Sequence, residues 1–381
     1  MKFIAKTLYG LENVVADELA TLGAADITVA NRAVMFTGEL PLLYTVNYKS
    51  GCALSFLMEI ASFRIRSAED LYNATSKIAW ERYMSSDQTF SIVPVVKSEI
   101  FSHTGYAALK AKDAIVDRFR KREGKRPSVS TGNPDILINL HISHGSVTVS
   151  LDSSGDPLYK RGYRSENVAA PLNEVLASGM IRLSGWKPGE SLVDPMCGSG
   201  TISIEAGLIA CNIAPGSFRK SFGFQRWKDY DRRLFDLVRE KLDKQVNMPA
   251  SLKIECSDIS IDAVKAAEIN IGNAGLGALI TPVVSDLADL NPSGKEGYLI
   301  INPPYGERLS QGETNELYAM IGSKLKHSFE GYTAWIISSN RESLKFIGLK
   351  SSAKHILFNG ALECRFERFE MYPGSRRKPL S

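Results

Sequence analysis

The stretch from Leu192 to Thr201 constrains the fold more than any other part of the chain. Its sequence is LVDPMCGSGT: a short apolar strand leads into an acidic residue, a glycine-rich turn follows, and a helix begins at Thr201. Glycines let the backbone adopt positive φ and approach a ligand closely. The helix behind the turn leaves its first N–H groups without intrahelical partners. This pattern is typical of an α/β sheet that binds a nucleotide-like cofactor beyond the carboxyl end of a strand.

The residues around the glycines narrow the class of cofactor. A phosphate-binding P-loop needs Gly-Lys-Ser or Gly-Lys-Thr, and this stretch contains no lysine. A dinucleotide-binding turn has a third glycine where this chain has Ser203. The acid ahead of the glycines, Asp194, would repel a pyrophosphate but attracts a cation, and S-adenosylmethionine carries an ammonium and a sulfonium. We therefore expect S-adenosylmethionine, with Asp194 meeting its ammonium. The alternative is a strand-to-helix turn without a ligand.

Two further strands end in acids. A strand over Lys253–Ser257 is followed by Asp258, and a strand over Ile280–Asp286 ends in Asp286. The acid after the second strand of such a sheet accepts hydrogen bonds from ribose hydroxyls, and Asp286 is placed to accept from an adenine amine. An insertion over 215–249 explains why Asp258 follows the glycines at long range. Each carboxylate could instead cap the next helix. Three acids at three strand ends favour the ligand.

The most specific signal is Asn302-Pro303-Pro304-Tyr305, which follows a strand over Gly297–Ile301. Two prolines cannot continue a central strand, so the chain leaves the sheet here in a stiff conformation. The exocyclic amine of a base is a poor nucleophile because its lone pair is delocalised into the ring. The Asn302 side-chain oxygen and the Pro303 carbonyl can each accept one amine N–H, while Tyr305 stacks on the base, so positioning replaces a strong base. The alternative is a Pro-Pro loop with a surface tyrosine.

Three regions combine cations with aromatic residues or with helix ends, and each is a candidate RNA contact. A helix over Gly105–Arg122 ends in a basic cluster, and Tyr159–Arg164 interleaves three cations with two tyrosines. The candidate RNA-binding residues are Lys160, Arg161, Arg164, Arg118, Lys121 and Arg122. Both groups could equally be solvated surface charges. The insertion over 215–249 could line an RNA surface or act as a lid whose aromatics pack on the core.

The rest of the chain divides into recognisable modules. The first 60 residues follow a β-α-β-β-α-β order, which is the ferredoxin-like pattern. An α+β region follows, and the turn-rich stretch Asp152–Pro157 ends it. Helices are predicted over Pro171–Leu183, Glu316–Lys326 and Asn340–Phe346, and the final strands close a seven-strand sheet. The predicted boundaries are 1–61, 62–153, a linker over 154–170, and 171–381.

Composition excludes several classes of protein. The chain has 381 residues, of which 44% are hydrophobic, enough for two or three domains with cores of their own. Its five cysteines form no CxxC pair, which argues against zinc and against a disulfide framework and fits the reducing cytoplasm. No metal site is expected at His141 and His144, because strand spacing points them to opposite faces. No signal peptide and no apolar run of about 18 residues is evident, so no membrane partner is expected. The net charge of +4 permits a nucleic-acid partner.

The glycine turn and the Asn-Pro-Pro-Tyr loop resemble those of class I S-adenosylmethionine-dependent methyltransferases acting on exocyclic amines of bases. The whole chain is similar to the THUMP-containing RNA methyltransferases, and within them to the first half of the large-subunit ribosomal RNA guanine-N2 methyltransferases. This resemblance rests on Lys2–Gly23, the module to Leu151, the stretch Lys160–Arg164 and Pro171-Leu172. It implies a ferredoxin-like N-terminal region, a THUMP RNA-binding domain and a Rossmann-like α/β methyltransferase domain. Some relatives carry a second methyltransferase half, for which we expect no counterpart here.

The resemblance also implies roles for individual residues. The glycine-turn residues hold the methionine part of S-adenosylmethionine, Asp258 and Asp286 hold the adenosine, and Asn302 to Tyr305 hold the target amine. Pro171 and Leu172 also approach the cofactor. The candidate cofactor residues are therefore Asp194, Pro195, Gly198, Gly200, Thr201, Asp258, Asp286, Asn302, Pro171 and Leu172.

The expected function is methyl transfer to the N2 amine of a guanine in RNA, with 23S ribosomal RNA as the expected substrate. A transfer RNA guanine or the N6 amine of an adenine stays open, because the Asn-Pro-Pro-Tyr geometry serves any exocyclic amine. A non-catalytic RNA-binding assembly factor with a vestigial pocket is the remaining alternative.

Overall fold

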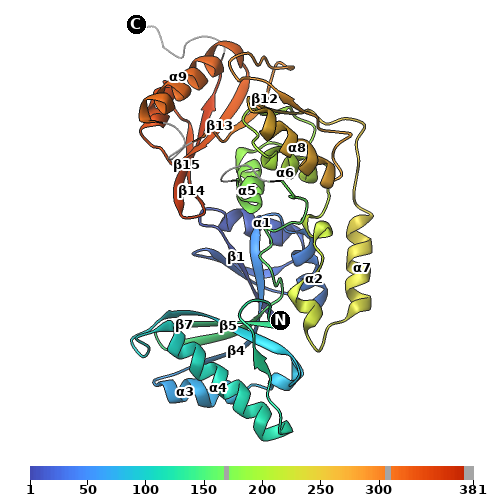
Figure 1. The fold of residues 1–381 in the computed structure, drawn as a ribbon, viewed down its shortest axis with the longest axis vertical. Coiled ribbons are helices and arrows are strands. Elements are labelled where there is room, and N and C mark those ends of the chain that lie inside the picture. Colours follow the sequence, from blue (N-terminus) through green and yellow to red (C-terminus); the bar gives the residue numbers. More distant parts are fainter. Residues whose placement is uncertain (167–170, 305–309, 373–381) are drawn as a thin grey trace. The chain divides into compact units, whose positions relative to one another are not determined.

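The computed structural model describes residues 1–166, 171–304 and 310–372. The described chain forms two compact units (Figure 1). The N-terminal unit contains Met1–Thr7, Val15–Leu158 and Arg219–Lys241. The C-terminal unit contains Leu8–Val14, Tyr159–Phe218 and the chain from Leu242 onward.

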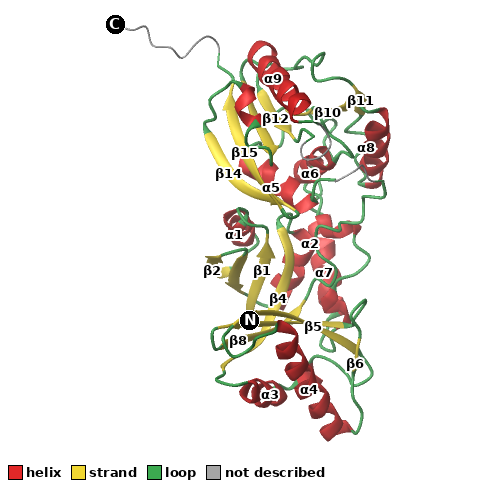
Figure 2. Ribbon diagram, turned by 60° about the vertical axis from the view of Figure 1, so that its left-hand side comes forward, coloured by secondary structure: helices red, strands yellow, loops and turns green. Residues whose placement is uncertain are grey.

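The N-terminal unit is built on one eight-stranded sheet with the order β2-β3-β1-β4-β8-β7-β5-β6. Its first part follows the predicted β-α-β-β-α-β order: β1(Lys2–Thr7), α1(Glu12–Thr21), β2(Ala25–Ala30), β3(Ala33–Thr37), α2(Leu40–Lys49) and β4(Ala53–Arg64). Its second part contains α3(Ala68–Lys77), η1(Trp80–Arg82), β5(Thr89–Lys97), α4(Thr104–Glu123), β6(Ser128–Val129), β7(Ile136–Ser143) and β8(Ser146–Asp152). Helices α3 and α4 lie side by side (Figure 2). The ferredoxin-like and α+β expectations are confirmed.

The two N-terminal modules share strand β4, which the sequence did not predict. β4 pairs with β1 along its first half and with β8 from Leu57 to Arg64. The predicted boundary at residue 61 therefore falls inside a strand. The strand continues past the predicted end because Ser62, Phe63 and Arg64 find partners in the hairpin of β7 and β8, about 80 residues later in the chain.

Residues 219–241 of the insertion belong to the N-terminal unit, and several of their aromatic side chains are buried. It contains η2(Pro215–Phe218), η3(Gly223–Arg226) and α7(Arg232–Asp243). Phe222, Phe224 and Phe235 are buried and form an aromatic cluster with Tyr44 and Tyr48 of α2. These aromatic rings fill a core and cannot stack on bases.

The cations of the insertion are also used within the N-terminal unit. Arg219 donates to the carbonyl oxygens of Ser154, Asp156 and Pro157, and its guanidinium lies over the Phe222 ring. These contacts satisfy the backbone of the turn that follows β8. The sequence left the role of these aromatic residues open, and the burial of Phe222, Phe224 and Phe235 favours packing in a core over stacking on bases.

The C-terminal unit is built on a seven-stranded sheet, as predicted, with the order β11-β10-β9-β12-β13-β15-β14. Its strands are β9(Leu192–Asp194), β10(Ile254–Asp258), β11(Pro282–Val284), β12(Gly297–Ile301), β13(Tyr332–Ser338), β14(Ala353–Asn359) and β15(Leu362–Glu370). The five neighbouring strands β11, β10, β9, β12 and β13 run parallel, while β15 is antiparallel to both β13 and β14. Its helices are α5(Glu174–Ser184), α6(Thr201–Ala210), α8(Ile261–Asn273), α9(Gln311–Ser328) and the 3-10 turn η4(Ser343–Ile347).

From β9 the chain first adds β10 and β11 on one side of the sheet and then adds β12 and β13 on the other side. The point where this order reverses lies between β9 and β12. β9 pairs with β10 on one side and with β12 on the other, through Leu192–Tyr298 and Val193–Leu299. Ligands of open α/β sheets bind at this switch point, beyond the carboxyl ends of the strands. Apolar side chains of β9, β12 and β13 pack against α9 beneath it and form a core with Tyr318, Ile321 and Leu325.

Several predicted elements differ from the structure. The helix predicted over Pro171–Leu183 begins only at Glu174, because Asn173 caps it by accepting from the N–H groups of Val175 and Leu176. The helix predicted over Asn340–Phe346 is a short 3-10 turn that ends at Gly348, where φ is +67°. Only Pro282–Val284 of the predicted strand Ile280–Asp286 pairs with a neighbour.

Among the described helices, none has the length and apolar character needed to cross a membrane. Within the same residues, no group of three or more His, Cys, Asp or Glu side chains could hold a metal ion. All five cysteines are free and buried.

Candidate active site

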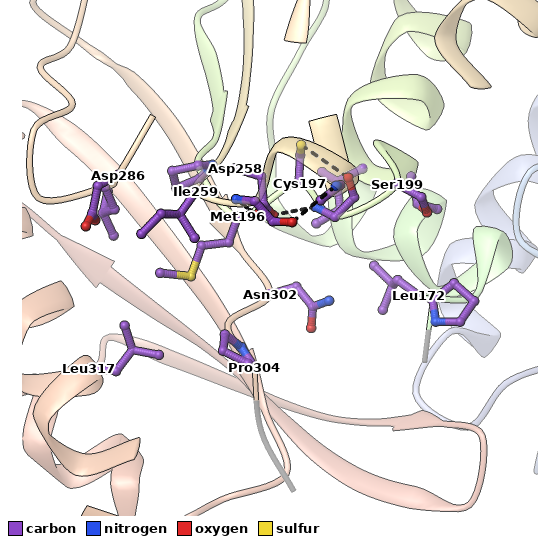
Figure 3. Close-up of a pocket in the computed structure, with 18 of the residues that line it drawn as sticks. Leu172, Met196, Cys197, Ser199, Asp258, Ile259, Asp286, Asn302, Pro304 and Leu317 are labelled. Atoms are coloured by element: carbon purple, nitrogen blue, oxygen red, sulfur yellow. Dashed lines mark hydrogen bonds between the residues drawn. The ribbon is translucent and has the colours of Figure 1, made fainter. Parts of the chain in front are cut away.

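A cavity of about 390 Å³ lies at the carboxyl ends of the parallel strands, in the C-terminal unit (Figure 3). All of the predicted cofactor residues except Asp194 and Gly200 line it: Pro171, Leu172, Pro195, Gly198, Thr201, Asp258, Asp286 and Asn302. Figure 3 shows Asp286 and Leu317 toward one end of the cavity and Ser199 and Leu172 toward the other, with Asn302 between them. The structure thus brings the glycine turn and the exit loop of β12 to one cavity.

The glycine turn depends on backbone conformations that other residues adopt at a cost. Gly198 has a φ of +54° and Gly200 a φ of +83°. A Cβ atom at Gly200 would also lie 3.2 Å from the Cβ of Ala267 in α8. The Gly198 N–H donates to Asp258 Oδ2 at 2.9 Å, which ties the turn to the end of β10. The two glycines therefore place the turn between two strand ends.

Asp194 lies beneath the glycine turn and does not line the cavity. Its side chain is 0% exposed, and Oδ2 accepts from the Ser203 N–H at 3.2 Å and the Ser203 hydroxyl at 2.9 Å. Burial raises the pKa of this carboxyl to about 7, against the lowering effect of these hydrogen bonds. Asp194 therefore holds the first turn of α6 through Oδ2, while its buried Oδ1 has no hydrogen-bond partner among the described residues. The expected contact with an ammonium stays a prediction.

The other two acids do line the cavity. Asp258 accepts from two backbone N–H groups, that of Gly198 on Oδ2 and that of Ser260 on Oδ1. Ser260, and not Asp258, caps α8, because its hydroxyl accepts from the Ala263 N–H. Asp286 accepts from the Ala288 N–H at 2.9 Å in the turn after β11. Each carboxylate oxygen can accept more than one hydrogen bond, so both residues keep capacity toward a ligand.

Two polar side chains at the cavity have a buried atom without a hydrogen-bond partner among the described residues. These atoms are Asn302 Oδ1 and Ser199 Oγ. A buried polar atom without a partner costs free energy, and such atoms in a native cavity indicate a place for a ligand. Pro304 lines the cavity beside Asn302, and Pro303 is buried. Tyr305 lies outside the described residues.

The helix-end cations predicted to contact RNA are partly used inside the protein. Arg118 donates to both carboxylate oxygens of Glu81, at 2.8 and 2.7 Å, and to the Ser76 carbonyl. The hydrogen bonds from Arg118 lower the pKa of Glu81 to about 2. Arg122 also pairs with Glu81, at 2.6 Å, while Lys121 is exposed.

The second predicted RNA group behaves in the same way. Lys160 is exposed, but the Arg161 side chain is only 2% exposed and pairs with Glu205. The prediction of an RNA contact is therefore wrong for Arg161, because its charge is enclosed in the protein. Arg164 is 13% exposed and donates to the Leu172 carbonyl and the Thr201 hydroxyl.

The sequence analysis did not identify three residues that line the cavity or hold its glycine turn. Asn270 of α8 is 0% exposed and donates to the Ser199 carbonyl of the glycine turn. A polar residue on the otherwise apolar face of Ala263, Ala266 and Ala267 was the available signal. Ile259 and Leu317 also line the cavity, but single apolar residues of this kind give no distinctive pattern.

The sheet order, the glycine turn and the Asn-Pro-Pro exit loop beside one cavity define a Rossmann-like methyltransferase fold of class I. Comparison with family models gives the same class: residues 161–368 match the RMKL-like methyltransferase domain. Residues 66–152 match the THUMP domain and residues 2–54 the RlmL ferredoxin-like domain. The chain belongs to the RMKL-like methyltransferase family.

Individual relatives agree with this family. A candidate RNA methyltransferase of Synechocystis is 39% identical over 371 residues, 97% of each chain. The ribosomal RNA large subunit methyltransferase K/L of Syntrophotalea carbinolica is 39% identical over 97% of this chain. The match covers 54% of that protein, and the same share of its Shewanella frigidimarina counterpart, so the chain spans about half the length of these relatives.

Two crystal structures share the whole architecture. SMU.472, complexed with SAH, has a TM-score of 0.88 and 30% identity over 98% of this chain and 99% of its own. A Listeria monocytogenes protein, predicted to be an N6-adenine-specific DNA methylase, has a TM-score of 0.87 and 29% identity over 97% of this chain and 96% of its own.

Proposed function

We propose that this protein transfers a methyl group from S-adenosylmethionine to the exocyclic N2 amine of a guanine in large-subunit ribosomal RNA. The observation that carries the proposal is Asn302 Oδ1, a buried acceptor without a partner among the described residues, beside a cavity bounded by the glycine turn. An amine N–H is the group that such an acceptor needs.

The residues of the cavity fit the proposed cofactor. Asp258 would accept from the ribose hydroxyls and Asp286 from the adenine amine, while Gly198, Ser199 and Leu172 would surround the methionine part. When bound, S-adenosylmethionine supplies an activated methyl group on a sulfonium. Its apolar and polar parts match a cavity lined by both kinds of side chain, as is usual for cofactor sites.

The chain's own contribution to the reaction is the positioning of the amine. Asn302 Oδ1 and the Pro303 carbonyl would each accept one amine N–H, which directs the nitrogen lone pair into the cavity. The Pro-Pro sequence restricts the backbone, so these acceptors are held in place before the base arrives. Tyr305 is proposed to stack on the base. Positioning of the amine by these contacts does not require a strong general base.

RNA is proposed as the substrate because of the THUMP match and the names of the relatives. The guanine N2 amine is proposed from the resemblance of the motifs, and an adenine N6 amine would fit the same acceptors. A base in a duplex must leave the stack to reach such a cavity, so the substrate nucleotide is expected in an accessible or unpaired region.

The test uses RNA from a strain that lacks this gene, incubated with the purified protein and S-adenosylmethionine carrying an isotopically labelled methyl group. The RNA is separated into ribosomal and transfer RNA, digested and analysed by nucleoside mass spectrometry. Labelled N2-methylguanosine in large-subunit ribosomal RNA is the expected result. Labelled N6-methyladenosine would refute the choice of base, and label confined to transfer RNA would refute the choice of substrate. RNA binding without SAH binding would identify an assembly factor instead.

A further inference from the structure

The stretch Arg161–Glu166 is held by contacts with α6 and α8, although its composition resembles a nucleic-acid contact. Arg161 and Tyr163 are buried, and both contact Glu205 of α6: the Tyr163 hydroxyl donates to Oε1 at 3.0 Å, and the Arg161 guanidinium lies 3.4 Å from it. Glu205 is 1% exposed. A buried carboxylate is stable only when it is paired and hydrogen-bonded, and these two residues satisfy it.

Helix α8 holds the same stretch from another side. Asn270 Oδ1 accepts from the Ser165 and Glu166 N–H groups at 3.0 and 3.1 Å. The Nδ2 group of the same residue donates to the carbonyls of Glu166 and Ser199, at 2.9 and 3.2 Å. Through one buried amide, the backbone of the stretch is therefore connected to the glycine turn.

Arg164 connects two walls of the cavity directly. One nitrogen, Nη2, donates to the Leu172 carbonyl and to the Thr201 hydroxyl, both at 2.8 Å. Leu172 and Thr201 line the cavity from different segments, one before α5 and one at the first position of α6. The same nitrogen lies 3.2 Å from Glu174 Oε1, so the cation is neutralised where it sits.

The position of Arg164 is electrostatically costly for a residue with a purely structural role. It contacts the N-terminal end of α6, where the helix dipole disfavours a cation. Glu174 offsets this cost, although it is itself buried, and burial raises the pKa of Glu174 to about 7 against the lowering effect of Arg164. An apolar side chain would fill such a position without these costs, but it could not join a carbonyl on one wall to a hydroxyl on the other.

We propose that Arg164 is a positioning residue for the cofactor, which sets the separation between the Leu172 wall and the Thr201 wall of the cavity, and that it is not an RNA contact. The proposal rests on binding of S-adenosylmethionine in this cavity, but not on the identity of the methylated base or RNA. A lysine at position 164 keeps the positive charge, but its single ammonium on a shorter side chain cannot reproduce the geometry of the guanidinium.

The experiment compares Arg164→Lys and Arg164→Ala with Lys160→Ala, which removes an exposed cation from the same stretch. Calorimetry measures SAH affinity, filter binding measures affinity for bulk ribosomal RNA, and circular dichroism verifies folding. Both Arg164 variants should lose SAH affinity, by roughly ten-fold for lysine and more for alanine, with RNA affinity kept within two-fold. Lys160→Ala should leave SAH affinity unchanged. The KM for S-adenosylmethionine should rise in Arg164→Lys while kcat at saturation stays within about three-fold.

The opposite pattern would overturn the proposal: unchanged SAH affinity with weakened RNA binding in Arg164→Lys would make Arg164 an RNA contact. If neither SAH affinity nor RNA affinity changes in Arg164→Lys, the observed contacts are dispensable and the proposal is also overturned. If Arg164→Ala does not fold, Arg164→Lys alone decides, because it keeps the charge beside Glu174. Absence of SAH binding by the unaltered protein would overturn both this proposal and the proposed function, whereas methylation of an adenine would overturn only the latter.

Discussion

The buried carboxyl of Asp194 makes the stability of this protein depend on pH in a way that one substitution should remove. Asp194 is enclosed beneath the glycine turn, and Ser203 satisfies only one of its two oxygens. Asparagine has nearly the same shape, and its side-chain oxygen can accept the same two hydrogen bonds. Asparagine cannot ionise, so Asp194→Asn separates the charge of this side chain from its packing.

The expected magnitude follows from the pKa of the group. Burial raises the pKa of Asp194 from 3.8 to about 7 in the folded protein. Between these values the unfolded chain ionises the carboxyl while the folded protein keeps it protonated, so rising pH favours unfolding through this group. A pKa difference of about three corresponds to about 4 kcal/mol of unfolding free energy. The folded protein has this stability below pH 4 and loses it as the pH rises through about 7.

The assay is urea unfolding of the wild type and Asp194→Asn at intervals from pH 4.5 to 8, without cofactor, with Asp289→Asn as a control at an exposed aspartate of the same unit. The stability of Asp194→Asn relative to wild type should increase across this range by about 3 kcal/mol, because other titrating groups cancel in the comparison. The control should show no such trend. A difference between wild type and Asp194→Asn that does not change with pH would refute the reasoning, since Asp194 would then ionise equally in both states.

Four further substitutions, one of them a control, test the site and the packing that supports it. Asn302→Ala should lower kcat about a hundred-fold in the methylation assay while SAH affinity in calorimetry stays within two-fold, and equal losses in both would refute a role in positioning the amine. Asp258→Ala should instead weaken SAH binding at least ten-fold, because it removes the proposed acceptor of the ribose hydroxyls and frees the glycine turn; unchanged affinity would contradict this. Gly322→Ala should destabilise the protein by roughly 3 kcal/mol in urea unfolding, because its Cβ would lie near the Ile347 carbonyl oxygen. Gly272→Ala, in open space on α8, should stabilise it by up to about 1 kcal/mol; similar effects of both changes would show that the close approach at Gly322 does not matter.

The strands and helices around the site could be predicted because short-range patterns determine them. Gly297–Ile301 is a strand with the predicted bounds, since a buried apolar run ends at two prolines. The acids at 258 and 286 line the cavity because parallel strands bring their carboxyl ends to one edge. The position of Asp194 could not be predicted, because an acid before a glycine turn can point into the cavity or beneath it. Ser203, which decides between them, follows Asp194 by nine residues.

Pairings over long sequence separations escaped prediction for a related reason. The continuation of β4 to Arg64 depends on a hairpin near residue 146, and the role of the insertion depends on Tyr44 and Tyr48. Local composition describes only one side of such a contact. The aromatic and basic residues of the insertion were equally compatible with a solvent-exposed surface and with a core, until the helix α2 that covers them was known.

The cations show how this limitation affects functional inference. Clusters of arginine and lysine predicted two RNA contacts, yet Arg118 and Arg122 share Glu81, and Arg161 and Arg164 are enclosed beside buried carboxylates. Arginine is favoured in such pairs because its planar fork satisfies several acceptors at once, and the same fork suits a phosphate, so composition alone does not separate the two uses. The proposed RNA surface is therefore best sought among cations that the structure leaves exposed, such as those at 121 and 160. Replacing both with alanine should reduce the salt dependence of RNA binding by about two phosphate contacts, with cofactor affinity unchanged, whereas an unaltered salt slope would place the RNA elsewhere.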